Sequence, residues 1–204
     1  MLLDLPAQLI TERLVLRPYQ TGDGLTYYEA CLRNKAHLLP YEAGNPALNI
    51  TTEEEAEILV REFAAAWDSR KAFFFGAWMK PDCTVFVAQI YVGVVSWELP
   101  EFEIGYFVDC LHEGQGFVTE AVRAALGFAF GNLQAHRVRL GCNDTNERSY
   151  RVAERCGFIR EGHLRQTRPD VRLPDGSFSG EYLYGILRAE FEGCGRPDYQ
   201  AEMT

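Results

Sequence analysis

The sequence predicts an α/β protein in which helices cover both faces of one mixed β-sheet. Three observations support this fold class. Apolar residues recur at helical spacing in several segments, β-branched and aromatic runs of strand length lie between them, and clusters of Gly and Pro mark the turns. The pattern gives about seven strands and about four helices over 204 residues.

The N-terminal part supplies one strand and two helices. Its predicted elements are a strand at Leu14–Leu16, a helix at about 21–35, a loop at 37–49 and a helix at about 52–69. Pro18 stops the strand, and Gly22 and Gly24 weaken the start of the first helix. Thr52 and Glu55 have the spacing of a capping box, and apolar residues follow at helical spacing. The second helix is therefore predicted to be amphipathic.

The rest of the chain alternates between strands and helices. The predicted strands are Phe73–Met79, Thr84–Ile90, Val92–Trp97, Glu103–Val108, His136–Leu140, Phe158–Leu164 and Glu181–Leu187, and the predicted helices are Phe117–Leu133 and Asn146–Cys156. Turns are expected at Lys80–Asp82 and Pro174–Gly176, because Pro, Asp and Gly favour turn conformations. Gly157 suits the position just past a helix end.

Composition excludes several classes of function. Acidic residues outnumber basic ones by 29 to 20, and the formal net charge of −9 argues against a nucleic-acid partner. An apolar run of about 18 residues is absent, so no membrane span is expected. Met1–Ile10 carries Asp4 and Pro6 without a basic cluster, unlike a secretory signal. We therefore expect a cytoplasmic protein.

The cysteines indicate a reduced protein that binds no metal. There are six of them: Cys31, Cys83, Cys110, Cys142, Cys156 and Cys194. They form no CxxC pair, and no His lies close enough in sequence to complete a zinc site. We expect buried thiols.

A glycine-containing loop between a strand and a helix is the first functional signal. The strand Glu103–Val108 is followed by Gly114 and Gly116, and the helix begins at Phe117. Backbone amides at such a loop and helix start suit a phosphate or pyrophosphate, although short loops of this kind also serve as plain turns. Neither a Walker loop nor a dinucleotide fingerprint matches the spacing.

Five segments together resemble the GNAT acetyltransferase superfamily, and within it the RimJ/RimL branch of protein N-terminal acetyltransferases. They are Thr11–Arg17 (TERLVLR), Glu103–Tyr106 (EIGY), Gly114–Ala121 (GQGFVTEA), Asn146–Ser149 (NERS) and Gly157–Gly162 (GFIREG). Their order and separations fit the branch. The resemblance covers about residues 10–192, so residues 1–204 are predicted to be one domain with a mostly antiparallel sheet.

The resemblance implies acetyl-CoA as cosubstrate, no metal, and a strand 103–108 that splays from its neighbour to receive the pantetheine arm. The implied cofactor-binding residues are Phe107, Val108, Glu113, Gly114, Gln115, Gly116, Phe117, Thr119 and Asn146. Phe107 and Val108 would act through their main chain, and Gly114, Gln115 and Gly116 through amides that hold the pyrophosphate. Asn146 would bond the pantetheine, with helix N-cap as the alternative role.

Two positions depart from the family pattern. Leu111 stands where the loop usually opens with Gln or Arg, three residues before its first glycine. Ala153 stands seven residues after Asn146, where many members carry a Tyr that acts as general acid. Phosphate binding is then expected to rest on backbone amides, and another acid is needed.

Ser149 and Glu103 are the catalytic candidates. Ser149 lies one helical turn after Asn146, so it could donate a proton to the leaving sulfur. Its alternative role is helix capping, and Tyr106 and Tyr150 are further candidate acids. Glu103 could remove a proton from the incoming amine if an apolar cleft raises its pKa, and its alternative is a solvated or salt-bridged strand carboxylate.

The resemblance implies direct acetyl transfer from acetyl-CoA to a primary amine, and the lack of a legible nucleophilic triad agrees with transfer without an acyl-enzyme. By resemblance the amine is the N-terminal α-amine of a protein of the ribosomal-protein type. A small amine such as a polyamine, amino acid or aminoglycoside is the alternative, and a non-catalytic CoA-binding sensor is a second one. The expected acceptor loops, about 34–51 and 165–181, match no recognisable pattern. The resemblance alone suggests a homodimer.

Overall fold

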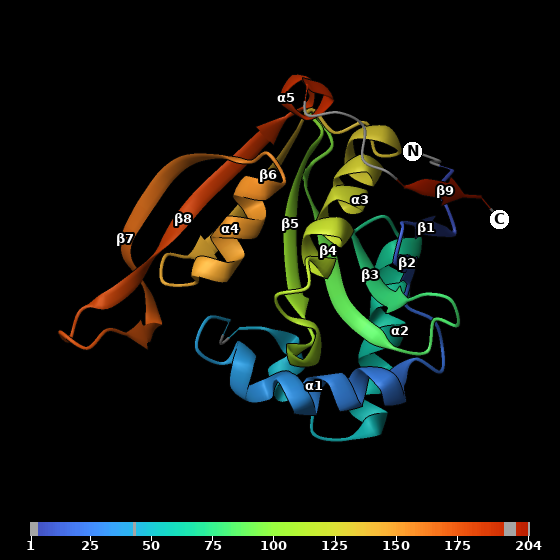
Figure 1. Ribbon diagram of the computed structural model, residues 1–204, viewed down its shortest axis with the longest axis horizontal. Coiled ribbons are helices and arrows are strands. Elements are labelled where there is room, and N and C mark those ends of the chain that lie inside the picture. Colours follow the sequence, from blue (N-terminus) through green and yellow to red (C-terminus); the bar gives the residue numbers. More distant parts are fainter. Residues whose placement is uncertain (1–3, 43, 194–198, 204) are drawn as a thin grey trace.

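A β-sheet runs through the whole computed structural model, which describes residues 4–42, 44–193 and 199–203. The strands are β1 (Gln8–Ile10), β2 (Leu14–Pro18), β3 (Ala72–Met79), β4 (Phe86–Ser96), β5 (Glu101–Val108), β6 (Arg137–Asn143), β7 (Ile159–Arg172), β8 (Phe178–Leu187) and β9 (Gln200–Glu202). Within these residues the sheet has nine strands in the order β7-β8-β6-β5-β4-β3-β2-β1-β9. Figure 1 places β1 and β9 at the side of the molecule opposite β7 and β8.

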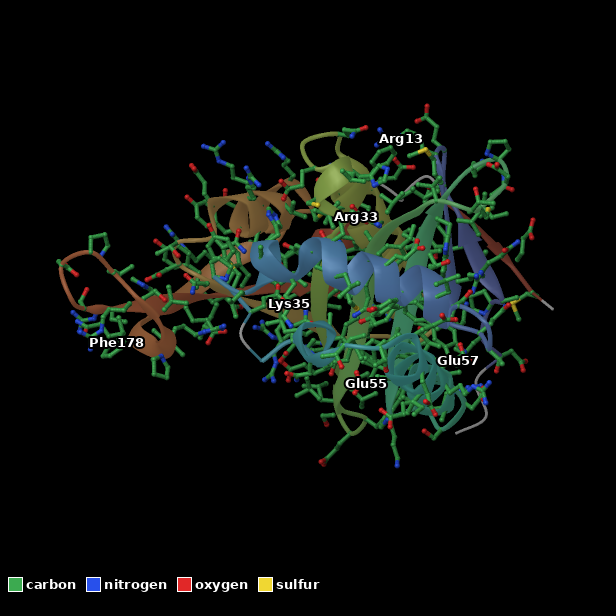
Figure 2. The ribbon with its side chains drawn as sticks, turned by 90° about the horizontal axis from the view of Figure 1, so that it is seen from below. Arg13, Arg33, Lys35, Glu55, Glu57 and Phe178 are labelled. Carbon is green, nitrogen blue, oxygen red and sulfur yellow. The ribbon has the colours of Figure 1, made fainter. Side chains whose placement is uncertain are left out.

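Helices cover both faces of the sheet, as predicted. They are α1 (Gly24–Leu38), α2 (Glu53–Asp68), α3 (Phe117–Gly131), α4 (Glu147–Arg155) and α5 (Arg188–Gly193), with short 3₁₀ helices η1 (Pro46–Asn49) and η2 (Cys110–His112). Strand β3 shows how the two cores divide, because side chains alternate along a strand. Phe73 and Phe75 pack with α3 in one core, whereas Phe74 and Trp78 pack with α1 and α2 in the other. Figure 2 views the second face, with α1 carrying Arg33 and Lys35.

One seam in the sheet differs from the rest. Among the described strands, β5 and β6 form the only parallel pair, and they pair at three positions, from Glu101 opposite Arg137 to Glu103 opposite Arg139. Beyond Glu103 the strands are no longer paired with each other, while β5 stays paired with β4 as far as Val108. The predicted splay of strand 103–108 is thereby confirmed.

Several predicted elements need correction. Segments 84–90 and 92–97 are one strand, β4, which a bulge between Val94 and Ser96 distorts without ending it. The predicted loop 37–49 begins later because α1 continues to Leu38, and it ends in η1, whose N-cap Asn45 accepts a bond from the Ala47 amide. The predicted loop 165–181 is mostly the extended β7–β8 hairpin. The remaining additions, β1, β9 and α5, are three to six residues long and carry no periodicity.

The β7–β8 hairpin forms an arm beyond the body of the molecule. Strand β7 has 14 residues and β8 has 10, and Phe178 lies towards the far end of the arm in Figure 2. Figure 1 shows α4 in the space between this arm and β5. Residues at the base of the arm thus face the part of the fold where β5 and β6 separate.

The TERLVLR and TEA motifs meet in one hydrogen-bonded cluster. Glu120, in the first turn of α3, accepts bonds from Thr11 Oγ1 at 2.6 Å, the Arg13 amide at 2.9 Å and Arg13 Nε at 2.7 Å. Burial raises the pKa of Glu120, but the bonds from Thr11 and Arg13 outweigh it and leave the pKa below its usual value. The turn between β1 and β2 is thereby tied to the helix that follows the glycine loop.

The cysteines agree in part with expectation. Cys31, Cys142 and Cys156 are buried, and burial raises the pKa of each thiol to about 12. Cys83 and Cys110 are free but partly exposed, which corrects the expectation of burial, and Cys194 lies outside the described residues. In the described part of the chain, no group of three or more His, Cys, Asp or Glu side chains could hold a metal ion. None of its helices combines the length and apolarity that a membrane crossing requires.

Candidate active site

Three cavities adjoin one another where β5 separates from β6. The loop cavity, about 500 Å³, lies against Gly114, Gly116, Phe117 and Thr119. The central cavity, about 480 Å³, lies between the end of α1 and the start of α4, and the side cavity, about 260 Å³, lies between β5, β6 and the base of the arm. The loop and central cavities share Val108, Glu113, Val118, Arg148 and Val152. The central and side cavities share Tyr41, Glu42, Tyr106, Asn146 and Ser149.

The glycine loop is built to present backbone amides. Gly114 and Gly116 have φ of +70° and +82°, which favour glycine. Gly116 is the N-cap of α3 and offers no side-chain cap, so the first amides of the helix are free to meet an anion. Phe117 and Thr119 line the loop cavity, while Gln115 turns its side-chain amide to the Leu111 carbonyl at 3.3 Å.

Three arginines of α4 supply positive charge that the loop itself lacks. Leu111 is 65% exposed and contributes no charge. Arg148, Arg151 and Arg155 line the loop cavity from the opposite wall. Their spacing of three and four residues places them on one face of the helix. Sequence reasoning missed this face, although the spacing was legible once the helix at 146–156 was predicted.

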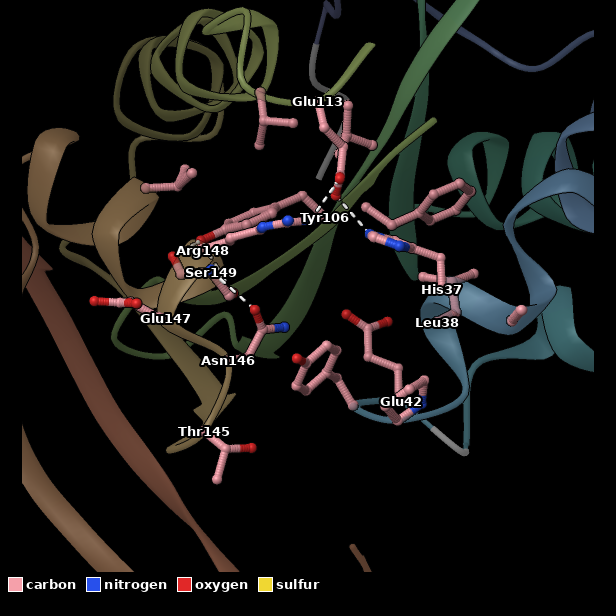
Figure 3. A pocket seen from close by; sticks show the side chains of 17 residues that line it. His37, Leu38, Glu42, Tyr106, Glu113, Thr145, Asn146, Glu147, Arg148 and Ser149 are labelled. Atoms are coloured by element: carbon pink, nitrogen blue, oxygen red, sulfur yellow. Dashed lines mark hydrogen bonds and ion pairs between the residues drawn. The ribbon is translucent and has the colours of Figure 1, made fainter. Parts of the chain in front are cut away.

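Glu113 links both walls of the central cavity. Its carboxylate lies 2.5 Å from His37 Nε2, on α1, and 2.5 Å from Arg148 Nη1, on α4. Figure 3 shows these two contacts crossing the cavity. Glu113 was predicted to bind cofactor. Its position on the boundary between the loop and central cavities is compatible with that role, which stays a prediction.

Asn146, Ser149 and Tyr106 meet at the start of α4. Asn146 is the N-cap, and its Oδ1 accepts the Ser149 amide at 3.2 Å, which leaves the Asn146 Nδ2 group available to a ligand. Tyr106 donates its hydroxyl to the Ser149 carbonyl at 2.8 Å, and Ser149 Oγ lies 3.5 Å from that hydroxyl. Burial raises the pKa of Tyr106 well above its usual value. Two hydroxyl groups thus stand side by side in the cavity wall.

Ala153 shows why a tyrosine does not fit at its position. It is the buried residue of α4 and is fully enclosed by the core.

We expect Ala153→Tyr to destabilise the protein by about 1–3 kcal/mol through overpacking and to leave turnover no higher. Urea unfolding and thiol release measure the two effects, with Arg151→Tyr at the exposed neighbouring position as the stability control. An Ala153→Tyr enzyme with native stability and faster turnover would contradict the expectation.

Glu103 lies outside the central cavity that Asn146, Ser149 and Tyr106 line. It lines the side cavity but not the central one. Its carboxylate is 44% exposed and lies 2.8 Å from Arg139 Nη2, across the parallel seam. This geometry matches the salt-bridged alternative considered from the sequence. The proposed catalytic role of Glu103 stays a prediction.

Sequence reasoning missed Glu42. It lies between α1 and η1, in a segment without periodicity, and it lines the central and side cavities. Burial raises the pKa of Glu42, which a bond from Asn45 Nδ2 at 2.8 Å and the charge of Arg168 only partly offset. Phe107 and Val108 also line the central cavity, with the Phe107 side chain buried against α1 and α2.

Known proteins share both the sequence and the fold of this chain. The family description "Acetyltransferase (GNAT) domain" matches residues 13–159. The probable N-acetyltransferase YjcK of Bacillus subtilis is 32% identical over 133 residues, which are 65% of this chain and 71% of the relative. The ribosomal protein uS5-alanine N-acetyltransferase of Escherichia coli is 23% identical over 195 residues, 90% of this chain and 92% of the relative.

Solved structures of other proteins share the fold of this chain. RimJ of Mycobacterium smegmatis, solved in complex with CoA-disulfide, has a TM-score of 0.78 at 23% identity over 100% of both chains. The glycine loop, the splayed strand and the basic face of α4 together fit an elongated, phosphate-bearing thioester. The chain belongs to the GNAT acetyltransferase family and is an acetyl-CoA-dependent N-acetyltransferase.

Proposed function

We propose that the acceptor is the N-terminal α-amine of a protein, of the ribosomal-protein type, and that the enzyme acts in the cytoplasm where such an acceptor is made. The observation that carries the proposal is the side cavity, which meets the central cavity at Ser149 and is lined by the carboxylates of Glu42, Glu103 and Glu181. Carboxylates attract an ammonium group. A peptide end could enter here while its following residues lie along the arm.

The names of relatives support the same acceptor class, since one of them states acetylation of a ribosomal protein at alanine. When bound, acetyl-CoA supplies an activated acetyl group as a thioester. On this proposal the loop amides and the α4 arginines hold its phosphates, Asn146 Nδ2 holds the pantetheine arm, and Ser149 delivers a proton to the leaving sulfur.

A panel of acceptors tests the proposal. We expect N-terminal peptides to exceed polyamines, free amino acids and aminoglycosides in kcat/KM by at least about tenfold, which corresponds to roughly 1.4 kcal/mol of transition-state discrimination. Free-thiol release measures turnover, and a peptide with a blocked N-terminus but a free lysine is the matched control. Faster turnover of a small amine would assign the alternative acceptor. Thermal stabilisation by acetyl-CoA without thiol release from any amine would instead favour a binding protein.

A further inference from the structure

We propose that Glu42 is the general base that takes a proton from the acceptor amine. The proposal rests on acetyl transfer to an amine but not on which amine is used. Glu42 lines the central cavity with Ser149 and Asn146, and it also lines the side cavity through which we place the acceptor. Figure 3 shows its carboxylate pointing into the central cavity from the wall opposite Asn146.

Position separates Glu42 from the other carboxylates. The described carboxylates that line the central or side cavity are Glu42, Glu103, Glu113, Glu147 and Glu181. Of these, Glu42 alone lines both cavities, and the boundary between the cavities is where an amine from the side cavity meets a thioester in the central one. A base must reach the proton it removes, directly or through one water. Glu42 meets that geometric condition best.

Charge also separates them. Cations lie against the other four carboxylates: Arg139 beside Glu103, His37 and Arg148 beside Glu113, Arg151 beside Glu147, and Arg168 beside Glu181. The hydrogen bond that Glu42 accepts comes from the neutral amide of Asn45, at 2.8 Å, and Arg168, which lies beside Glu181, also acts on Glu42 through its charge. Burial raises the pKa of Glu42 by more than the Asn45 bond and the Arg168 charge lower it, so the pKa of this carboxyl stays above its usual value.

The loop that carries Glu42 is held from two sides. The Glu42 amide donates to the Leu38 carbonyl at 2.9 Å, which ties the loop to the end of α1. Arg168 of β7 donates to the Tyr41 carbonyl at 2.8 Å, which ties the loop to the arm. Arg168 is thus a positioning residue for Glu42. The titratable groups that line the two cavities together with Glu42 are Tyr41, His37 of α1, Glu103 and Tyr106 of β5, Glu113 of the glycine loop, Cys142 of β6, Glu147 and Arg148 of α4, Arg168 of β7 and Glu181 of β8.

The proton balance follows. The acceptor enters as an ammonium, and Glu42 takes one proton from it, so that nitrogen regains a lone pair. Nitrogen forms a bond to the acetyl carbon as the carbon–sulfur bond breaks, and the electron pair of that bond stays on sulfur. The second nitrogen proton passes to water as the amide forms, while Ser149 gives its hydroxyl proton to the sulfur and regains one from water. The products are an amide, a thiol and the proton that Glu42 returns to water.

Glu42→Gln tests the proposal. Using the amine that the wild-type enzyme turns over fastest, we expect kcat/KM near neutral pH to fall by roughly 10²–10⁴-fold, the range of general base catalysis. The acid-side limb assigned to Glu42 should disappear from the pH–rate profile. A weakly basic acceptor, already neutral at the assay pH, should recover a larger share of wild-type turnover. Thermal stabilisation by acetyl-CoA should be unchanged, which shows an intact fold and cofactor site.

Two further variants make the result decisive. Glu103→Gln removes the competing carboxylate, and Glu53→Gln on the exposed start of α2 controls for loss of one negative charge. The proposal is overturned if Glu42→Gln retains turnover within about threefold of wild type, or if Glu103→Gln alone abolishes the acid-side limb. A preference for small amines would contradict the proposed α-amine acceptor. The comparison of Glu42→Gln with Glu103→Gln would still test the proposed base, because it uses whichever amine the wild-type enzyme turns over fastest.

Discussion

Ser149→Ala is expected to lower kcat about 100-fold or more while acetyl-CoA affinity changes little. The hydroxyl is proposed to act on the leaving sulfur, and loss of a positioned proton donor has effects of this size. The capping bond of α4 uses the Ser149 amide and Asn146 Oδ1, so an alanine at 149 keeps it. The helix and the Asn146 side chain should therefore remain in place.

Steady-state thiol release and the thermal shift with acetyl-CoA separate rate from affinity for this variant. Tyr106→Phe is the matched comparison, because it removes the hydroxyl 3.5 Å from Ser149 Oγ. A larger loss in Tyr106→Phe than in Ser149→Ala would identify the phenol as the acid. Equal losses of rate and affinity in Ser149→Ala would make Ser149 a binding residue.

Asp109→Ala is expected to destabilise the protein by about 3–5 kcal/mol, because it leaves the partly buried Arg33 guanidinium without its partner. The Asp109 side chain is fully buried and accepts bonds from Arg33 Nε at 2.9 Å and the Leu111 amide at 3.0 Å. Asn34, also on α1, accepts the Cys110 amide at 2.7 Å. These bonds set where the glycine loop begins, so acetyl-CoA affinity should fall too.

The pH dependence of stability follows from the same site. Burial raises the pKa of Asp109, but the bonds from Arg33 and Leu111 outweigh it and the pKa is lowered. A lowered folded-state pKa contributes stability above the unfolded-state value of about 3.9 and loses it as pH falls through the folded-state value. Urea unfolding at neutral pH and near pH 3 should show a smaller difference between wild type and Asp109→Ala in acid. Asp82→Ala at an exposed turn is the control, and equal losses in both variants would contradict the argument.

Local signals in the sequence were read correctly where the structure depends on local chemistry. Thr52 and Glu55 form the capping box that was predicted, and α2 runs from Glu53 to Asp68. The split of β4 into two strands was wrong because Tyr91, which was placed between them, is paired with Phe74 of β3 and Gly105 of β5, so the strand continues through it. Strand β9 exists through pairing with β1 at the other end of the chain, which no local pattern records, and β1 has only two pairs with its neighbour β2.

In the candidate site, too, features set by local sequence were predicted, and features that depend on distant residues were missed. The glycine loop and Asn146 lie in motifs that are continuous in the sequence. The cavity walls around Glu42 that come from β5, α4 and the base of the arm lie 59 or more residues later in the sequence, so its local neighbours Leu38 and Asn45 do not mark it as a site residue. The ion pair of Glu103 depends on the parallel register that places Arg139 beside it.

The short parallel pairing between β5 and β6 affects how a bound ligand stabilises the sheet. Three paired positions join β5 to β6, whereas β6 and β8 pair at seven, so backbone pairing connects the β7-β8-β6 part of the sheet to the β5-β4-β3 part over a short stretch only. Side-chain links also cross this junction, including the Arg139–Glu103 ion pair, the bond from the Tyr106 hydroxyl to the Ser149 carbonyl, and Arg123 Nη2 to the Arg155 carbonyl at 2.9 Å. A ligand that contacts both parts of the sheet adds interactions across this junction. Binding of acetyl-CoA thereby stabilises the contact between the two parts of the sheet, in addition to supplying the acetyl group.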